Sequence, residues 1–212
     1  MCNRIVAHGE TPARGIAAGA MDNGAAMLDW IGPPQDWIGS VVPSDIEVAV
    51  SENVFITITH LTAYPTGFRF GFLALTKMRP GVICHEALDI ARQGSEDPDS
   101  LPLHFGVEFA DGRRADDITS WINIHGGDLG PSAFPESFPP DPEQDVFIQV
   151  GGVSTSDCRF SGGGWVWPLP PPDLMTFWIG WPAAELPVQP TRVDATPLLD
   201  AVPMSHPLWG NP

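Results

Sequence analysis

Alternating apolar and polar positions from residue 45 onward predict a series of short β-strands. The first two stretches have an aliphatic residue at every second position: Ile46, Val48 and Val50, then Val54, Ile56 and Ile58. A period of two places such a set on one face of a strand and the intervening residues on the other face. We therefore expect two half-buried strands, each with its aliphatic residues facing the core.

Two turn sequences predict hairpins between such strands. Residues 64–67, Tyr-Pro-Thr-Gly, have Pro at the second position of a turn and Gly at the fourth, and Asp111-Gly112 favours the positive φ of a tight hairpin. Alternating apolar residues stand beside both turns: Phe68, Phe70 and Phe72 after the first, and Phe105, Val107 and Phe109 before the second. We expect the phenylalanine stripe to face the core.

Four later segments have strand character and are separated by Gly-rich or Pro-rich breaks: 146–150, 159–169, 174–181 and 188–193. Short helices are expected at residues 83–93 and after Thr196, which we expect to cap a helix with Pro197 in its first turn. The sequence therefore predicts an all-β fold, an antiparallel β-sandwich of about eight strands with one or two short helices. A partly closed β-barrel is the alternative.

Residues 1–38 differ in character from the rest of the chain. They are rich in Gly, Ala and Pro and show no sustained period, so we expect a loose N-terminal arm. Trp30 and Trp37 are the large apolar residues by which this arm would dock. Residues 39–212 are expected to form a single β-sandwich domain, because sandwiches and barrels of this length occur as one unit.

The charge balance narrows the class of partner. The chain has 26 Asp and Glu against 10 Lys and Arg, and this acidic balance of −16 repels nucleic-acid phosphates and anionic membrane surfaces. We therefore expect no nucleic acid and no membrane as a partner. No stretch has the apolar length of a secretory signal or a membrane span, which predicts a cytoplasmic protein. Three widely spaced cysteines without a Cys-x-x-Cys pair predict reduced thiols.

Four residues are candidates for binding. Trp165 and Trp167 stand two apart, so on a strand both project from one face. They are either core residues of the sandwich or an exposed pair that anchors a partner or stacks on a sugar ring. Arg113 and Arg114 form a compact positive spot with the chemistry to grip a carboxylate or phosphate. The alternative is that these arginines balance neighbouring surface carboxylates: Asp111, Asp116 and Asp117.

The sequence features that suggest an enzyme are weaker than those that suggest binding. His125 directly precedes residues 126–145, and Asp128 lies near their start. This Gly- and Pro-rich stretch is long enough to act as a lid, which is the pattern of a small-molecule hydrolase or isomerase. The glycines at 162–164 lack the Lys-Ser/Thr of a phosphate-binding loop, so we expect them to supply a bulge or turn. The sequence predicts no catalytic residue, no metal ligand and no cofactor.

Three segments, taken in order, resemble a family of bacterial proteins, chiefly from actinobacteria: AYPTGF (63–68), FGVEFADGRR (105–114) and WVWPLPPP (165–172). The resemblance covers roughly residues 40–210. It implies a bacterial, intracellular protein. Because the family has no assigned activity, the resemblance implies no catalytic residue or cofactor.

The distinctive residues are aromatic, Gly and Pro rather than acid–base or metal clusters. This balance favours a non-enzymatic binding or protein-interaction module, such as an accessory or assembly subunit. A protein partner is expected, and self-association into a homo-oligomer is left open. The alternatives are the lidded hydrolase or isomerase and a carbohydrate-binding module that uses Trp165 and Trp167.

Overall fold

The part of the chain that the structure describes consists mainly of β-strands. A computed structural model describes residues 30–77, 103–117, 140–156 and 158–209. The strands in these residues are β1 (Trp37–Ile38), β2 (Ser40–Val50), β3 (Val54–Ala63), β4 (Phe68–Thr76), β5 (His104–Glu108), β6 (Arg114–Asp116), β7 (Phe147–Ser156), β8 (Arg159–Trp167), β9 (Leu174–Trp181), β10 (Leu186–Asp194) and β11 (His206–Pro207). One α-helix, α4 (Thr196–Ala201), and two 3₁₀ turns, η2 (Pro182–Ala184) and η3 (Val202–Met204), complete the described elements.

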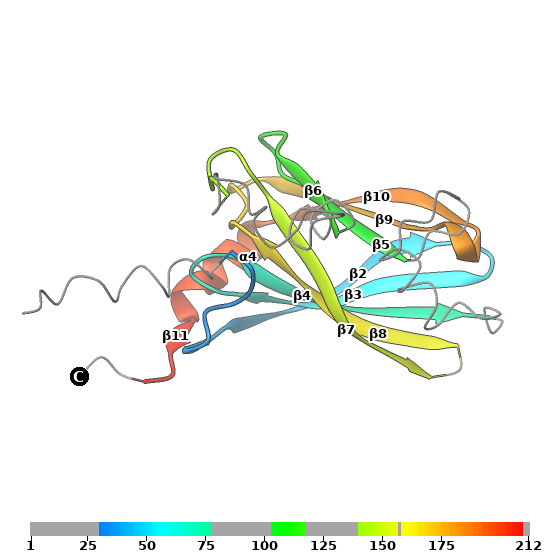
Figure 1. The fold of residues 1–212 in the computed structure, drawn as a ribbon, viewed down its shortest axis with the longest axis horizontal. Coiled ribbons are helices and arrows are strands. Elements are labelled where there is room, and N and C mark those ends of the chain that lie inside the picture. The colour runs from blue at the N-terminus through cyan, green and yellow to red at the C-terminus, as the bar shows by residue number, and fades with distance from the viewer. Residues whose placement is uncertain (1–29, 78–102, 118–139, 157, 210–212) are drawn as a thin grey trace, which may run out of the picture.

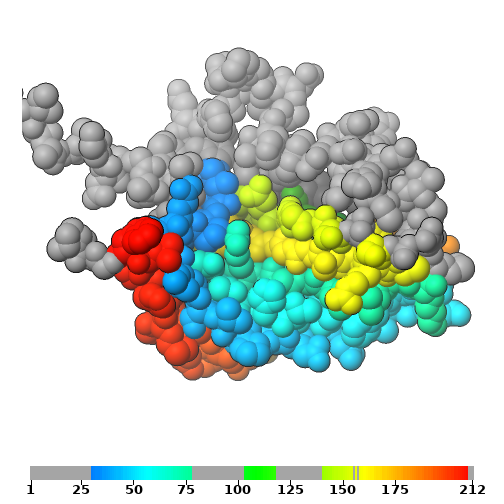
Figure 2. All heavy atoms as spheres, turned by 90° about the horizontal axis from the view of Figure 1, so that it is seen from below, coloured from blue at the N-terminus to red at the C-terminus, as the bar shows by residue number. Residues whose placement is uncertain are grey.

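Two antiparallel sheets form the two layers of a sandwich (Figure 1). The strand order is β2-β3-β4-β8-β7 in the five-stranded sheet and β10-β9-β5-β6 in the four-stranded sheet. The edge strands of the two sheets meet at both sides of the sandwich, where β10 contacts β2 and β6 contacts β7. Figure 2 looks onto the five-stranded layer, where β2 and β3 (blue to cyan), β4 (teal) and β8 (yellow) lie side by side. The predicted all-β antiparallel sandwich is confirmed, and the described strands do not close into the alternative barrel.

Both predicted hairpins are present. Strands β3 and β4 are joined by the turn at 64–67, where the N–H of Tyr64 donates to the carbonyl of Gly67 at 2.9 Å. Strands β5 and β6 are joined by the second turn, where Gly112 has a φ of +87°. A positive φ is accessible to glycine without steric cost, so the residue that predicted this turn is also the one its geometry requires.

The main core lies between the two sheets. Phe70 and Phe72 of β4 are buried, and both pack on Phe105 of β5 with ring centroids 5.4 and 4.7 Å apart. Phe70 also meets Phe177 of β9 at 5.6 Å. Each buried phenylalanine contributes about 1.5–3 kcal/mol, so a one-residue slip of β4, which would turn the stripe outward, is strongly disfavoured. The predicted phenylalanine stripe is confirmed as core.

Strand β2 departs from the predicted alternation. Its pairing with β3 shifts between Glu47 and Ala49, so Val48 and Ala49 are both buried while Val50 is 50% exposed. A β-bulge adds one residue to one strand and thereby reverses the faces of the residues that follow. The expectation that Val50 faces the core was wrong for this reason.

The closing helix is present, but its cap differs from the prediction. Ala195 rather than Thr196 is the N-cap residue of α4, and Oδ1 of Asp194 accepts a hydrogen bond from the N–H of Thr196 at 2.8 Å. This backbone hydrogen bond lowers the pKa of Asp194. The other expected helix, at 83–93, lies outside the described residues. Within the ranges given above, no helix has the length and apolar character needed to cross a membrane.

Candidate functional site

Trp165 and Trp167 pack in a second aromatic cluster on β8. They project from the face of the five-stranded sheet that is turned away from the main core, since Val166 between them belongs to that core. The cluster is formed by Trp30, Tyr64, Phe147, Trp165 and Trp167. Trp165 is 4% exposed and Trp167 is 9% exposed. The prediction that both indoles project from one face is confirmed, and they are core residues of this cluster.

Trp30 is hydrogen-bonded to the indole of Trp165. The Nε1–H of Trp165 donates to the carbonyl of Trp30 at 3.0 Å, and the Trp30 ring meets Phe147 edge-on at 5.2 Å. Trp37 packs against the same cluster, so docking through the two N-terminal tryptophans is confirmed. A sugar stacks on an exposed ring face, which the buried Trp165 and Trp167 do not offer. The expectation of an exposed tryptophan pair is therefore corrected to a buried one, and the carbohydrate-binding alternative stays a prediction.

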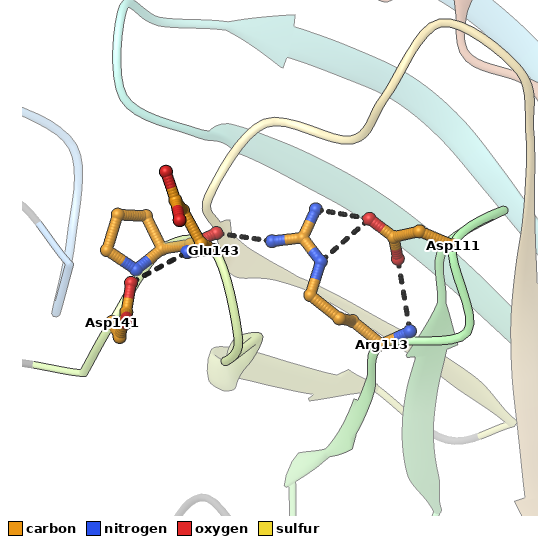
Figure 3. Close-up of polar contacts among 5 residues, drawn as sticks. Asp111, Arg113, Asp141 and Glu143 are labelled. Atoms are coloured by element: carbon orange, nitrogen blue, oxygen red, sulfur yellow. Dashed lines mark hydrogen bonds and ion pairs between the residues drawn. The ribbon is translucent and has the colours of Figure 1, made fainter.

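Arg113 is engaged by neighbouring groups (Figure 3). Its Nη2 lies 2.7 Å from Oδ2 of Asp111, its Nε donates to the same oxygen at 2.8 Å, and its Nη1 donates to the carbonyl of Pro142. The guanidinium also lies over the ring of Phe109, 5.3 Å from the centroid. The hydrogen bond from the Arg113 side chain lowers the pKa of Asp111. The arginine thus balances a neighbouring carboxylate, as one of the two sequence interpretations predicted.

The contacts of Arg113 connect two turns that are distant in sequence. Asp111 belongs to the β5–β6 turn, and Pro142 belongs to the turn before β7, in which Oδ1 of Asp141 accepts a hydrogen bond from the N–H of Glu143 at 2.9 Å. These contacts support a structural role for Arg113. Arg114 is exposed at the start of β6, and its assignment as a binding residue stays a prediction.

A groove lies beside Trp165 on the outer face of the five-stranded sheet. Its floor is a row of three glycines in register, because Gly71 of β4 pairs with Gly163 of β8 and Gly163 pairs with Gly151 of β7. Without side chains in this row, the backbone forms the floor of a hollow of about 580 Å³, which we call the glycine groove. The adjacent row of the sheet has larger side chains, in the order Thr62, Arg69, Trp165 and Gln149.

Packing explains part of this glycine row. A Cβ at Gly163 would lie 2.8 Å from the carbonyl oxygen of Phe70, which is closer than packed atoms approach. Gly163 is therefore required by the close approach of β4. At Gly151, by contrast, a Cβ would meet no atom within 4 Å. The open space at Gly151 is not a requirement of the fold, and it belongs to the groove.

The walls of the glycine groove carry groups that recognise polar ligands. The lining residues include Arg69, His60, Gln149, Thr62 and Tyr64, whose side chains end in a guanidinium, an imidazole, an amide and two hydroxyls. None of the described residues that line the groove is Asp or Glu. The groove therefore combines a backbone floor with polar walls that have no acidic side chain.

Sequence reasoning missed this groove. The register of β8 with β4 runs without a shift through Gly162 to Gly164, whereas the pairing of β8 with β7 shifts opposite Gly162, between Gly151 and Ser154, so the expected irregularity lies in β7. The glycines pack against neighbours, since a Cβ at Gly162 would lie 2.9 Å from the ring of Phe72. The sequence contained one signal of the groove. Gly71 stands two positions after Arg69, and Gly163 two positions after Ser161, so each glycine shares the outer face of its strand with that residue. The pairing of three strands was needed to bring the glycines together.

A second hollow, of about 620 Å³, lies on the outer face of the four-stranded sheet. Trp178, Gly106 and Asp116 form one row across β9, β5 and β6, and Glu108 and Arg114 pair two residues further along. Charges of both signs share this lining. The hollow therefore does not select a ligand by charge.

The residues of the predicted hydrolase or isomerase site, His125 and Asp128, lie outside the described residues. Where the structure does describe the chain, no group of three or more His, Cys, Asp and Glu side chains is placed to hold a metal ion. The enzyme alternative, the protein partner and the possibility of a homo-oligomer all stay predictions.

Comparison with known proteins adds no relative from which a role can be transferred. No protein-family model, curated protein or solved structure matches this chain. The resemblance to a bacterial family stays a prediction. The geometry of the described residues is therefore the basis for inferring a function, and it points to the glycine groove as the candidate site.

Proposed function

We propose that this chain is a non-enzymatic binding protein that holds its ligand in the glycine groove. The observation that carries the proposal is the row Gly71–Gly163–Gly151, which opens a hollow of about 580 Å³ in the outer face of the five-stranded sheet. Pockets for small ligands typically have volumes of about 300–1,000 Å³. The groove therefore has the size of a small-ligand site.

The groove is also built on rigid elements. Its floor belongs to three hydrogen-bonded strands, β4, β8 and β7. Trp165 at its edge is fixed by its hydrogen bond to Trp30 and by an edge-on contact with the Tyr64 ring at 5.7 Å. Groups held on strands are positioned more precisely than groups on loops. This preorganisation supports recognition of a ligand of defined shape.

The polar groups in the groove suit binding better than covalent chemistry. His60 is the histidine of the lining, and its imidazole is a common acid–base group in enzymes. Its Nδ1 lies 3.0 Å from Oγ1 of the adjacent Thr59, and both residues are exposed. In an enzyme, a hydroxyl–imidazole pair is oriented by a third group such as a carboxylate, and no Asp or Glu lines this groove in the described residues.

A variant that fills the groove tests the proposal. In Gly151→Phe the new ring occupies the open space above the floor, while Ser156→Phe adds the same ring at an exposed position of β7 outside the lining. We would screen metabolites of all charge classes by thermal denaturation, since a ligand at 100 times its Kd stabilises the folded state by about 2.7 kcal/mol. A ligand should raise the Tm of the wild type and of Ser156→Phe, but not that of Gly151→Phe.

Mass spectrometry of the recovered ligand supplies the second readout. The proposal expects the compound to be unchanged after incubation with the protein. Equal stabilisation of Gly151→Phe, chemical conversion of the compound, or a screen in which no compound stabilises the wild type would each contradict it.

A further inference from the structure

We propose that the ligand of the glycine groove carries a carboxylate or phosphate group, and that the guanidinium of Arg69 binds this group beside the ring of His60. The inference rests on the proposed function and names the chemical class of its ligand. Four observations support it: the charge of the lining, the state of Arg69, the position of His60 and the open floor.

The charge of the lining is opposite to that of the chain. Acidic residues outnumber basic ones by 26 to 10 in the sequence, yet the ionisable side chains that line the groove are Arg69, His60 and Tyr64. A concave site lined by one sign of charge attracts ligands of the other sign. The groove therefore favours an anion in a protein that otherwise repels anions.

Arg69 is available for such an anion. In the part of the chain that the structure describes, its guanidinium makes no ion pair or hydrogen bond, whereas Arg113 is paired with Asp111. The backbone of Arg69 is fixed between Thr62 of β3 and Trp165 of β8, and its side chain is exposed. A guanidinium presents a planar set of donors that matches carboxylate and phosphate oxygens.

His60 lies beside Arg69 because Gly71 has no side chain. His60 pairs with Gly71 across β3 and β4, and a Cβ on Gly71 would overlap the imidazole ring. Gly71 follows Arg69 by two positions, so the two residues share a face and stand about 7 Å apart along the strand. An anion bound by Arg69 therefore has the imidazole as a second donor within reach. The remainder of the ligand would lie over Gly163 and Gly151.

A neutral ligand fits these groups less well. It would cover Arg69 without neutralising its charge, and removing an unpaired charge from water costs more than removing a paired one. A cationic ligand would add repulsion to that cost. The lining thus discriminates by charge, in contrast to the second hollow beside Trp178, where both signs are present.

Isothermal titration with matched aromatic probes tests the inference. Benzoate and phenyl phosphate carry the two anionic groups on the same ring, and benzamide is their neutral counterpart. At constant ionic strength we expect both anions to bind the wild type at least about tenfold more tightly than benzamide, a difference of about 1.4 kcal/mol. The ratio of the two anion affinities identifies carboxylate or phosphate as the preferred group.

Two arginine variants show where the anion binds. Arg69→Gln should weaken both anions about tenfold or more. Arg159→Gln, which makes the same change of charge at an exposed arginine of β8 outside the groove, should leave their affinities within about twofold. Equal affinities in wild type and Arg69→Gln would overturn the inference, and so would the failure of both anions to bind at concentrations of about 10 mM.

The failure of this inference is distinguishable from failure of the proposed function. If benzamide binds as tightly as benzoate and Gly151→Phe abolishes the binding of both, the groove is a ligand site and the anionic class is wrong. If Gly151→Phe leaves the affinity of every bound probe unchanged, the groove is not the site, and both proposals fall.

Discussion

The side-chain amide of Gln189 pairs with the backbone of Val50 as a residue of a neighbouring strand would. Its Oε1 accepts a hydrogen bond from the N–H of Val50, and its Nε2 donates one to the carbonyl of Val50, both at 3.2 Å. Gln189 belongs to β10 of the four-stranded sheet, and Val50 ends β2 at the edge of the other sheet. Close by, Oγ1 of Thr191 donates to the carbonyl of Val48 at 3.0 Å. Side chains of β10 thus satisfy edge groups that would otherwise be open to another strand.

We expect Gln189→Glu to lower the free energy of unfolding by about 1 kcal/mol at neutral pH, because a carboxylate cannot donate to the carbonyl of Val50. Urea denaturation measures this difference. Gln35→Glu, at an exposed position, adds the same charge and is the control. The difference in the free energy of unfolding between the two variants should decrease below about pH 4.3, where a protonated glutamate can again donate a hydrogen bond. Equal losses at neutral pH would show that charge alone is responsible.

The ion pair of Arg113 with Asp111 makes stability depend on pH. The hydrogen bond from Arg113 holds the pKa of Asp111 below its ordinary value of 3.8. A carboxyl whose pKa is lower in the folded state contributes stability above its unfolded pKa, and this stability is lost as the pH falls through the folded pKa. We therefore expect Asp111→Asn to have a lower Tm than the wild type at neutral pH, and this difference to shrink progressively as the pH falls below 3.8.

Because Asp111 is exposed, the effect is small, at most about 1 kcal/mol. Asp200→Asn, at an exposed position of α4, removes the same charge as a control and should change the Tm less. A difference between Asp111→Asn and the wild type that stays constant from neutral to acidic pH would contradict the assignment of this ion pair.

The parts of the fold that the sequence predicted are those set by local rules. The turn at 64–67 and the dipeptide Asp111-Gly112 require particular backbone angles, and the stripe Phe68, Phe70 and Phe72 can be buried on only one face. Val50 was misplaced because a bulge in β2 depends on pairing with β3, which a single strand's pattern does not contain. The prediction that Thr196 caps helix α4 was wrong, because the side chain of Asp194 accepts the hydrogen bond from the N–H of Thr196 at the helix N-terminus.

The candidate site depends on contacts between distant segments, so the sequence did not predict it. Gly71, Gly151 and Gly163 come from three strands and meet only when β4, β8 and β7 pair in one register. The sequence did predict that Trp165 and Trp167 share a face, but whether that face is open depends on Trp30, which lies 135 positions away in the chain. Burial is therefore a property of the tertiary structure, and neighbouring residues along β8 do not determine it.

The hydrogen bond from Trp165 to Trp30 should contribute to stability. In Trp165→Phe the ring remains aromatic, but the N–H donor is lost. Because the buried carbonyl of Trp30 then loses this hydrogen bond, we expect the free energy of unfolding to fall by about 1–2 kcal/mol. Trp209→Phe is the matched control, since Trp209 is 77% exposed and should change the value by no more than about 0.5 kcal/mol. Guanidinium denaturation followed by circular dichroism measures both. Two equal, small changes would mean that this contact does not hold Trp30 in place.

The paired glycines of the groove floor should respond in opposite directions to the same substitution. Gly163→Ala brings a methyl group within 2.8 Å of the carbonyl of Phe70, and we expect a loss of about 1–3 kcal/mol in the free energy of unfolding. Gly151→Ala places its methyl group in open space and removes a residue that weakens strands, so we expect a gain of up to about 1 kcal/mol. Thermal denaturation of the two variants measures the contrast.

This contrast bears directly on the function of the groove. If Gly151→Ala is more stable than the wild type, the chain keeps a glycine there at a cost in stability, as expected where a ligand needs the space. Equal destabilisation by both substitutions would show that Gly151 and Gly163 are alike required for packing, and it would remove the structural reason for placing a ligand above them.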